Sequence, residues 1–263
     1  MSAPPDVAIL LRCYNDVRYL TQALDSVDRQ DYVGNLHVYV GLDMGSTDGT
    51  AALIRDRLGW STMSHDWQVQ PLGKMNRRWF VLVHPHMTLA AATRYLLPRI
   101  LAHPTIQRVL LLDADNYLDP NAVSRRVARH PGAEAPGLCA APIRWGTNEG
   151  APPFPIVMDG PIDGSKLLEA NFIDTLNPIW RADYLRERLL PRLQHTDPGD
   201  LVDDYLFNLL AAQDGQADFH WDTPDATYRF RKGSLTERTD VGARTDQTKQ
   251  AFVAIGRAEG WLK

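Results

Sequence analysis

The sequence predicts an α/β fold, in which a mostly parallel β-sheet carries helices on both faces. The first half of the 263 residues alternates short apolar runs with amphipathic stretches, which is typical of strands joined by helices. Residues 109–112 form a continuous apolar run that ends abruptly in acidic residues, as a buried parallel strand does. The 44% apolar and 23% charged fractions are those of a globular protein, which excludes a disordered or fibrous chain.

Strand and helix signals alternate along the chain. The expected strands are residues 7–11, 37–42, 67–70, 109–112 and 138–143. One helix is expected after Asn15 and one after Ser46 or Thr47, because these side chains can cap a helix. A third is expected over residues 88–101, where Pro98 should kink or end it. This alternation implies right-handed crossovers and one layered core.

The second half of the chain has weaker signals. Residues 144–164 are rich in Gly and Pro, and this composition fits either a loop over a site or a plain connector. We do not expect a domain boundary there, because the residues that follow contain too few strands to close a core of their own. A single domain is therefore expected over residues 1–263. His84 and His86 are expected to lie in a surface loop.

Charge, cysteine content and hydropathy narrow the class of protein. A net charge of -4 and a pI near 6.0 give no general basic field, so nucleic acid is not the expected partner. Two cysteines, Cys13 and Cys139, are too few for a disulfide framework and fit a reducing cytoplasm. The opening residues lack the basic stretch and apolar run of a secretory signal, so none is expected, and no apolar run approaches the roughly 18 residues that cross a bilayer. We expect a cytoplasmic protein whose work at a membrane, if any, is peripheral.

Acidic residues follow two of the predicted strands. Asp43 follows the second strand, and Asp113 and Asp115 follow the strand at 109–112. Ligands of open parallel sheets bind at the carboxyl ends of the strands, so these three carboxylates should share one edge. Only Ala114 separates Asp113 from Asp115, so in an extended segment both project to the same side, where repulsion raises one pKa unless a cation intervenes.

A hard divalent cation would offset the repulsion between these carboxylates. Mg²⁺ or Mn²⁺ binds one or two carboxylates and completes its shell with phosphate oxygens and water, which suits a diphosphate leaving group. The alternative is that residues 113–120 form a polar turn before a helix that starts near Pro120. The apolar run before Asp113 and the additional acid at Asp43 favour the metal site.

Three segments together resemble the family 2 glycosyltransferases of the GT-A fold. They are VAILLRCYN at residues 7–15, LDMGSTDGT at residues 42–50 and LDADN at residues 112–116. The resemblance implies a Rossmann-like, mostly parallel nucleotide-binding sheet. It also implies that residues 1–120 bind the nucleotide sugar and that residues 121–263 supply the acceptor-binding half and the C-terminal elements.

The resemblance assigns roles to the acids of the first half. It implies that Asp43 recognises the nucleotide base, that Asp113 contacts the ribose or the metal, and that Asp115 binds the metal. Asp48 is expected to cap a helix. Relatives often carry a Lys or Arg before the third helix that reaches the nucleotide, and Lys74 can play that part or be a solvated lysine. The remaining residues expected in the nucleotide-sugar site are Arg12, Tyr14, Asn15 and Ala114.

Two later segments extend the resemblance. Asp203-Asp204 resembles the acidic pair that opens a helix and supplies the catalytic base, with Asp204 the better candidate. The alternative is that two acids in a first helical turn are favoured by the helix dipole alone. YRFRKGSL at residues 228–235 resembles a stretch in which many relatives have a metal-binding His where this chain has Arg231. A guanidinium cannot bind a metal, but with Lys232 it can hold a diphosphate, so metal binding would rest on Asp115.

The resemblance implies an inverting transfer of a sugar from a UDP- or GDP-sugar to a hydroxyl acceptor, assisted by Mn²⁺ or Mg²⁺. The acceptor class, whether glycan, lipid or small molecule, is left open. One alternative is a haloacid dehalogenase-like phosphatase with Asp113 as nucleophile, although that motif normally lies on the first strand of the core. A nucleotidyltransferase would need a Gly-rich, Arg-containing N-terminal loop, which is missing. The other alternative is a nucleotide-sugar-binding protein without turnover.

Overall fold

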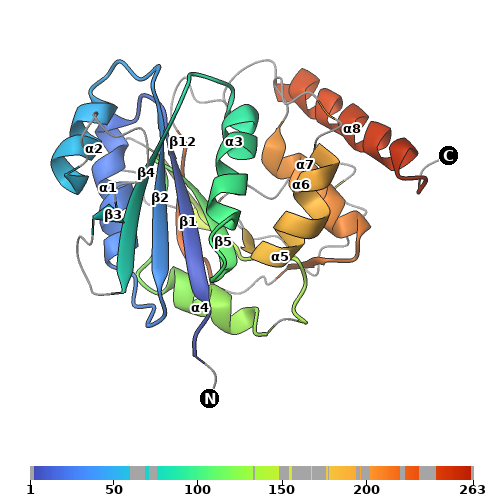
Figure 1. Ribbon diagram of the computed structural model, residues 1–263, viewed down its shortest axis with the longest axis horizontal. Helices are drawn as coiled ribbons and strands as arrows, with labels where there is room; N and C mark the ends of the chain where they lie inside the picture. The colour runs from blue at the N-terminus through green and yellow to red at the C-terminus, as the bar shows by residue number, and fades with distance from the viewer. Residues whose placement is uncertain are drawn as a thin grey trace.

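The structure is a computed structural model (Figure 1). It describes residues 3–59, 69–70, 76–132, 134–147, 154–155, 167, 176, 178–193, 196, 202–219, 223–230 and 241–261.

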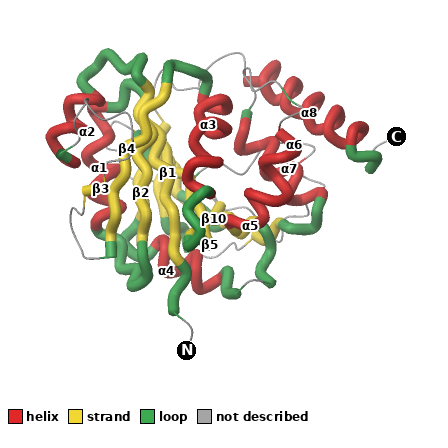
Figure 2. Tube along the Cα trace, viewed as in Figure 1, coloured by secondary structure: helices red, strands yellow, loops and turns green. Residues whose placement is uncertain are grey.

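An eight-stranded sheet forms the centre of the molecule, in the order β11-β7-β10-β5-β1-β2-β4-β3 (Figure 2). Its four long strands run parallel: β1 (Asp6–Cys13), β2 (Leu36–Asp43), β4 (Arg77–His84) and β5 (Ile106–Asp113). β7 (Leu138–Ala140) and β11 (Ala217–Phe219) pair parallel with each other. β10 (Pro178–Arg181) and β3 (Val69–Gln70) pair antiparallel with their neighbours. The sheet is thus mostly parallel, as predicted.

A second, four-stranded sheet lies beyond β5, in the order β6-β12-β8-β9. Its strands are β6 (Tyr117–Leu118), β12 (Ala226–Phe230), β8 (Arg144–Thr147) and β9 (Phe154–Pro155). β12 pairs antiparallel with β6 and parallel with β8. Because β6 starts two residues after Asp115, the pairing of β12 with β6 brings residues 226–230 close to the turn that follows β5.

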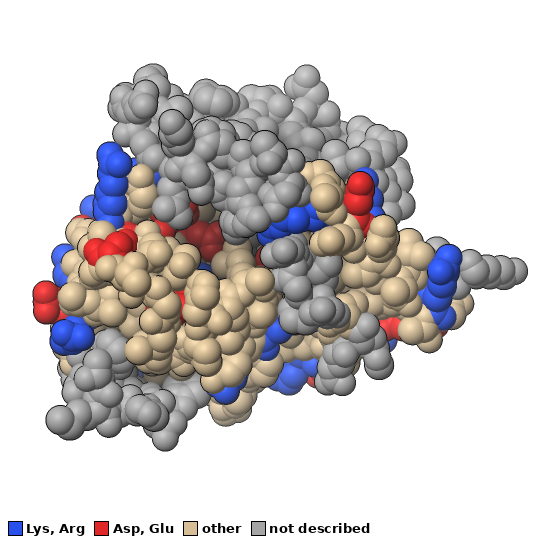
Figure 3. Space-filling model, turned by 90° about the horizontal axis from the view of Figure 1, so that it is seen from above, with Lys and Arg blue, Asp and Glu red and all other residues tan. Residues whose placement is uncertain are grey.

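The four long parallel strands all end at one edge of the sheet, which we call the C-terminal edge. It is the upper edge in Figure 1, and Figure 3 views the molecule from that side. There, acidic side chains lie at the bottom of a hollow in the surface. The edge is therefore recessed and negatively charged, as expected from the acids that follow the strands.

Helices cover both faces of the central sheet, which confirms the predicted fold class. α1 (Val17–Asp28), α2 (Thr50–Leu58) and α4 (Ala122–Arg129) pack on one face. The other face carries α3 (Leu89–Leu101), α5 (Ala182–Tyr184), η2 (Leu185–Leu189), α6 (Leu190–Leu193), α7 (Asp203–Gln213) and α8 (Val241–Ala258). The side chains of β1 point alternately to the two faces of the sheet. Leu10 therefore belongs to the hydrophobic core on the α3 side, while Ile9 and Leu11 belong to the core on the α1 side.

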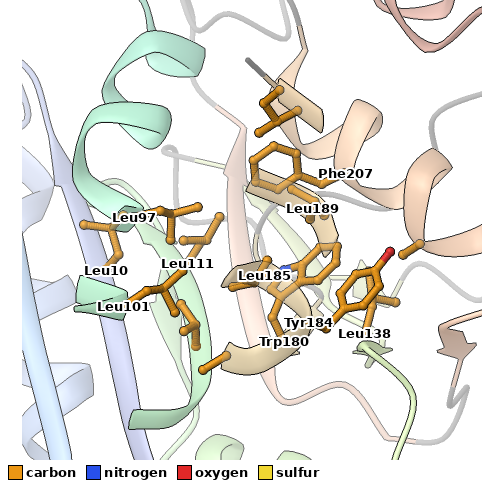
Figure 4. Packing of buried hydrophobic residues seen from close by; sticks show 14 of the residues in the cluster. Leu10, Leu97, Leu101, Leu111, Leu138, Trp180, Tyr184, Leu185, Leu189 and Phe207 are labelled. Atoms are coloured by element: carbon orange, nitrogen blue, oxygen red, sulfur yellow. The ribbon is translucent and has the colours of Figure 1, made fainter. Parts of the chain in front are cut away.

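The core on the α3 side is built from aliphatic side chains facing aromatic ones. Figure 4 shows Leu10 and Leu111 from the strands on one side of this contact and Trp180 and Phe207 on the other. Trp180 is 2% exposed, and its ring meets that of Phe207 edge-on at 6.1 Å between centroids. α7 is therefore packed firmly against the sheet. This packing fixes the position of the acidic pair at the start of α7.

The structure corrects several expectations. The strand β4 and the antiparallel strand β10 were not predicted, and His84 is a buried end residue of β4 rather than part of a surface loop. The expected strand at 138–143 is only three residues long. Pro98 does not end α3, which continues to Leu101 because buried leucines and Ile100 flank the proline on both sides. None of the helices among the described residues combines the length and apolar character needed to cross a bilayer.

Candidate active site

The sheet register places the predicted acids at one edge. Arg12 of β1 lies opposite Asp113 of β5 on one side and Gly41 of β2 on the other. Asp43 ends β2 two residues further on and lies opposite His84 of β4. Two strand spacings, roughly 10 Å across the sheet, and two residues along the strands therefore separate Asp43 from Asp113. The acids meet at the C-terminal edge as the sequence predicts.

Asp43 is buried and held by its neighbours. Its carboxylate accepts a hydrogen bond of 2.7 Å from the backbone N–H of Gly45. The Nδ1 atom of His86, in the loop before α3, lies 3.2 and 3.1 Å from the two carboxylate oxygens. The Tyr14 ring lies over the His86 ring with centroids 4.7 Å apart. Tyr14 and His86 are both exposed, so they form an aromatic rim beside the buried carboxylate.

Asn15 ties two loops of the C-terminal edge together. It adopts a left-handed backbone with φ of 53°. Its side-chain oxygen accepts a hydrogen bond of 2.8 Å from the N–H of Thr47, and its own N–H donates to the Ser46 hydroxyl. The loop that carries Tyr14 is thereby fixed to the loop that follows β2. The amide group of Asn15 is used in this contact.

Asp48 caps two helices at once. Its carboxylate accepts hydrogen bonds of 3.0 Å from the N–H of Val17, at the start of α1, and from the N–H of Thr50, at the start of α2. This is the capping role expected from the sequence, although the helix begins at Thr50 and neither Ser46 nor Thr47 caps it.

Asp48→Ala is expected to lower the free energy of unfolding by about 1–2 kcal/mol, because both helices lose a cap. Burial opposes the ionised carboxylate, but the hydrogen bonds from Thr50 and Val17 outweigh it and lower the pKa of Asp48. The stabilising effect should therefore be present above pH 3.8 and disappear as the pH falls through the lower folded-state pKa. Urea unfolding at pH 7 and pH 3 tests this. Asp48→Asn, which keeps an acceptor oxygen, is the control and should retain most of the stability at pH 7.

Arg12 is buried, with 4% of its surface exposed. Its Nε and Nη2 atoms lie 2.8 and 2.7 Å from Oδ1 of Asp113. Its Nη1 atom donates to the Thr93 hydroxyl at 2.7 Å and to Oδ2 of Asp203 at 3.1 Å. Burial opposes the charge, but Asp113 and Asp203 outweigh it and raise the pKa of Arg12. The guanidinium is thus a permanent internal cation.

The turn Asp113-Ala114-Asp115 is fixed from both sides. The N–H of Ala114, a fully buried residue, donates to the Arg12 carbonyl at 3.0 Å. On the other side, Arg229 of β12 donates from Nε to the Asp115 carbonyl at 2.9 Å. Asp113 uses Oδ1 for Arg12, and among the described residues its Oδ2 atom has no hydrogen-bond partner. The Asp113 side chain is 25% exposed, so its carboxylate is open to a ligand at the C-terminal edge.

The two acids that open α7 differ in their surroundings. Asp203 is buried, and its Oδ2 atom accepts from Arg12 and from the Thr93 hydroxyl, at 2.6 Å in the second case. Asp204 is half-buried and accepts one hydrogen bond, from the N–H of Tyr205 at 2.7 Å. Burial and the neighbouring Asp203 raise the pKa of Asp204 to about 7. The charge of Arg12 lowers this pKa and that of Asp113 raises it, so Asp204 lies within electrostatic range of the turn Asp113-Ala114-Asp115.

Comparison with known proteins supports the fold. The chain matches no protein-family model, and it matches no curated protein. TarS 1–349 of S. aureus in complex with UDP-GlcNAc has a TM-score of 0.66 and 14% sequence identity, over 95% of this chain and 66% of that one. The mannosyltransferase PcManGT of Pyrobaculum calidifontis, in complex with GDP-Man and Mn²⁺, has a TM-score of 0.56 and 18% identity, over 99% and 67%. The chain has the GT-A fold. It spans about two thirds of these structures, and 37% of another TarS structure.

Within this GT-A fold, three predicted site residues lie outside the described residues: Lys74, Arg231 and Lys232. Asn76 is described and lies at the edge opposite the site, where its carbonyl accepts from the N–H of Leu36 at the start of β2. The segment directly before α3 is instead residues 85–88, which contains His86. The sequence did not identify His86 and Thr93 as site residues. β4 was not predicted, and nothing in the sequence indicated that the third helix starts at the C-terminal edge.

The acidic residues at the C-terminal edge are chemically suited to bind a hard divalent cation. Among the described residues, no three His, Cys, Asp or Glu side chains gather into a ready-made metal site. Asp113 and Asp115 nevertheless supply two carboxylates from one turn, separated only by Ala114. Mn²⁺ or Mg²⁺ held by one or two carboxylates completes its shell with substrate phosphates and water. Such a cation would therefore bind together with a diphosphate.

Proposed function

We propose that the protein is an inverting glycosyltransferase that moves a sugar from a nucleoside-diphosphate sugar to an acceptor hydroxyl. The observation that carries the proposal is the C-terminal edge of the sheet. There the turn at Asp113 to Asp115 lies within electrostatic range of Asp204, a carboxylate whose pKa is raised to about 7. A GT-A chain that brings a metal turn and a neutral-pH base together can perform group transfer from a diphosphate.

The donor is proposed to bind across the ends of β1, β2 and β5. Asp43 would accept hydrogen bonds from the base, with Tyr14 and His86 beside it. TarS and PcManGT, which share the fold, were solved with UDP-GlcNAc and with GDP-Man, so a UDP- or GDP-sugar is the donor class that we propose. Asn15 and Ala114 would shape this site through the backbone that they fix.

The metal is proposed to be Mn²⁺ or Mg²⁺ on Asp115, joined by the Oδ2 atom of Asp113. When bound, it would supply positive charge for the departing diphosphate. Arg231 and Lys232, which follow β12 in the sequence, are proposed to contact the same phosphates. Arg229 of β12 already contacts the turn, so β12 leads toward this site.

Asp204 is proposed as the general base. Its carboxylate would take the proton from the acceptor hydroxyl as that oxygen attacks the anomeric carbon, and direct displacement inverts the configuration there. Asp203 is proposed as the second candidate, because Arg12 and Thr93 hold its Oδ2 atom and its side chain is only 6% exposed. We propose one domain over residues 1–263, with the donor bound by residues 1–120 and the acceptor by residues 121–263.

The test is an assay of purified protein with Mn²⁺ and a panel of UDP- and GDP-sugars. Release of nucleoside diphosphate that rises when a hydroxyl acceptor is added is the expected result. Analysis of the product by NMR should show an anomeric configuration opposite to that of the donor. Release of inorganic phosphate from simple phosphate esters would indicate a phosphatase. Binding of a sugar nucleotide without turnover, across a broad acceptor panel, would indicate a binding protein.

A further inference from the structure

We propose that Arg12 is a positioning residue. Its buried positive charge would hold the turn Asp113-Ala114-Asp115 in place relative to helix α7, which carries the proposed base Asp204. This inference rests on the proposed function. The sequence predicts that Arg12 contacts the nucleotide sugar, but the guanidinium is 4% exposed and points inward. Among the described residues, its side chain forms hydrogen bonds with Asp113, Thr93 and Asp203, on three other elements.

The contacts of Arg12 join distant parts of the chain. Asp113 is 101 residues away in sequence and Asp203 is 191 residues away, so one guanidinium connects the donor half to the acceptor half. Without a cation between them, two carboxylates in this recess would repel each other. Arg12 supplies that cation permanently. The planar fork of an arginine suits such a two-sided contact better than the point charge of a lysine.

The same contacts set the direction of Asp204. Successive residues of an α-helix are turned by roughly 100°, so fixing Asp203 toward Arg12 turns Asp204 to another side of the first turn. Thr93 of α3 completes the anchor, because its hydroxyl accepts from Arg12 and lies 2.6 Å from Oδ2 of Asp203. The Leu89 carbonyl lies 3.0 Å from the same hydroxyl, but the bond to a carboxylate is the stronger one. Arg12, Thr93 and Asp203 therefore act on catalysis through Asp204.

The test compares two threonine substitutions of the same size and shape. Thr93→Val removes the hydroxyl at the anchor, while Thr105→Val removes one that donates to Asp6 at the opposite edge of the sheet, at 2.6 Å. We expect Thr93→Val to lower kcat for transfer roughly 10-fold, with donor KM and the Mn²⁺ requirement changed less than about twofold. Thr93→Ser, which keeps the hydroxyl, should recover most of the rate. Thr105→Val should match the wild type.

Further variants keep the inference testable if Thr93→Val does not fold. Arg12→Lys keeps the charge but not the fork, and it should lower kcat at least as much as Thr93→Val does. Thr93→Val combined with Asp203→Asn should be less harmful than the product of the two single effects, because both act through one anchor. If an active wild type has a Thr93→Val variant that behaves like Thr105→Val, or that loses donor affinity instead of kcat, the inference is wrong. A wild type that releases no nucleoside diphosphate under any condition overturns the proposed function as well.

Discussion

Asp204→Asn is expected to lower kcat for sugar transfer by roughly 10²- to 10⁴-fold, which is the range for loss of a general base. Asparagine has the size of the aspartate but cannot accept the proton of the acceptor hydroxyl. Donor affinity should change little, since Asp204 lies on α7 and the proposed donor site lies on β1, β2 and β5. Steady-state rates at saturating donor and acceptor test the first expectation, and calorimetric titration with the nucleoside diphosphate tests the second.

The wild-type pH profile should carry the signature of the same residue. Burial first, and then the charge of Asp203, raises the pKa of Asp204 to about 7. The base works only when deprotonated, so kcat/KM should fall as the pH drops below about 7. A profile that stays flat from pH 8 to pH 5 would argue against Asp204 as the base.

The stability of the variant gives an independent test. Because the pKa of Asp204 is raised from 3.8 to about 7 in the folded protein, its stabilising contribution is complete below 3.8 and is lost as the pH rises through about 7. Asp204→Asn, which is neutral at every pH, should therefore unfold at a higher temperature than the wild type at pH 8. The difference should shrink as the pH falls toward 4.

Asp203→Asn is the matched control, because it changes the adjacent acid in the same way. Asp203 is paired with Arg12, so removal of its charge leaves a buried guanidinium with less compensation. The melting temperature should then fall at pH 8, opposite in sign to the effect of Asp204→Asn. Should Asp203→Asn abolish transfer while Asp204→Asn remains active, the assignment of the base would have to be reversed.

The sequence alone predicts the framework of this site well. Alternating apolar runs indicate β1, β2 and β5, and the carboxyl-end rule for parallel sheets then places Asp43 and Asp113 at one edge, where the structure has them. These inferences depend on local periodicity and on a general topological rule. Neither requires knowledge of which side chains touch.

The contacts inside the edge are less predictable. Arg12 was expected in the nucleotide-sugar site because it lies in the segment that resembles the family. Its inward direction follows from Asp203, 191 residues away, and no periodicity encodes that distance. The antiparallel strand β10 was not predicted because it starts at Pro178, which weakens the strand signal of the sequence. His86 could have been found had the apolar residues of β4 been read as a strand ending at the same edge.

Asp115→Asn is expected to lower the transfer rate at a fixed Mn²⁺ concentration by roughly 10²- to 10³-fold, the cost of removing one electrostatic group from a developing charge. The proposed metal ligands are Asp115 and one oxygen of Asp113, whose other oxygen is bound to Arg12. Loss of the Asp115 charge leaves too few protein ligands to hold the cation with the donor. The Mn²⁺ concentration that gives half-maximal rate should therefore rise in the variant, as measured by titration of metal-stripped protein.

Asp119→Asn separates a metal effect from a general loss of negative charge near the turn. Asp119 lies four residues after Asp115 and is paired with Arg144, so its substitution should leave the Mn²⁺ dependence as in the wild type. A cation held by carboxylates and diphosphate alone should dissociate readily once the product leaves. We therefore expect EDTA to abolish turnover at once, and full activity in EDTA would show that Arg231 and Lys232 neutralise the diphosphate without a metal.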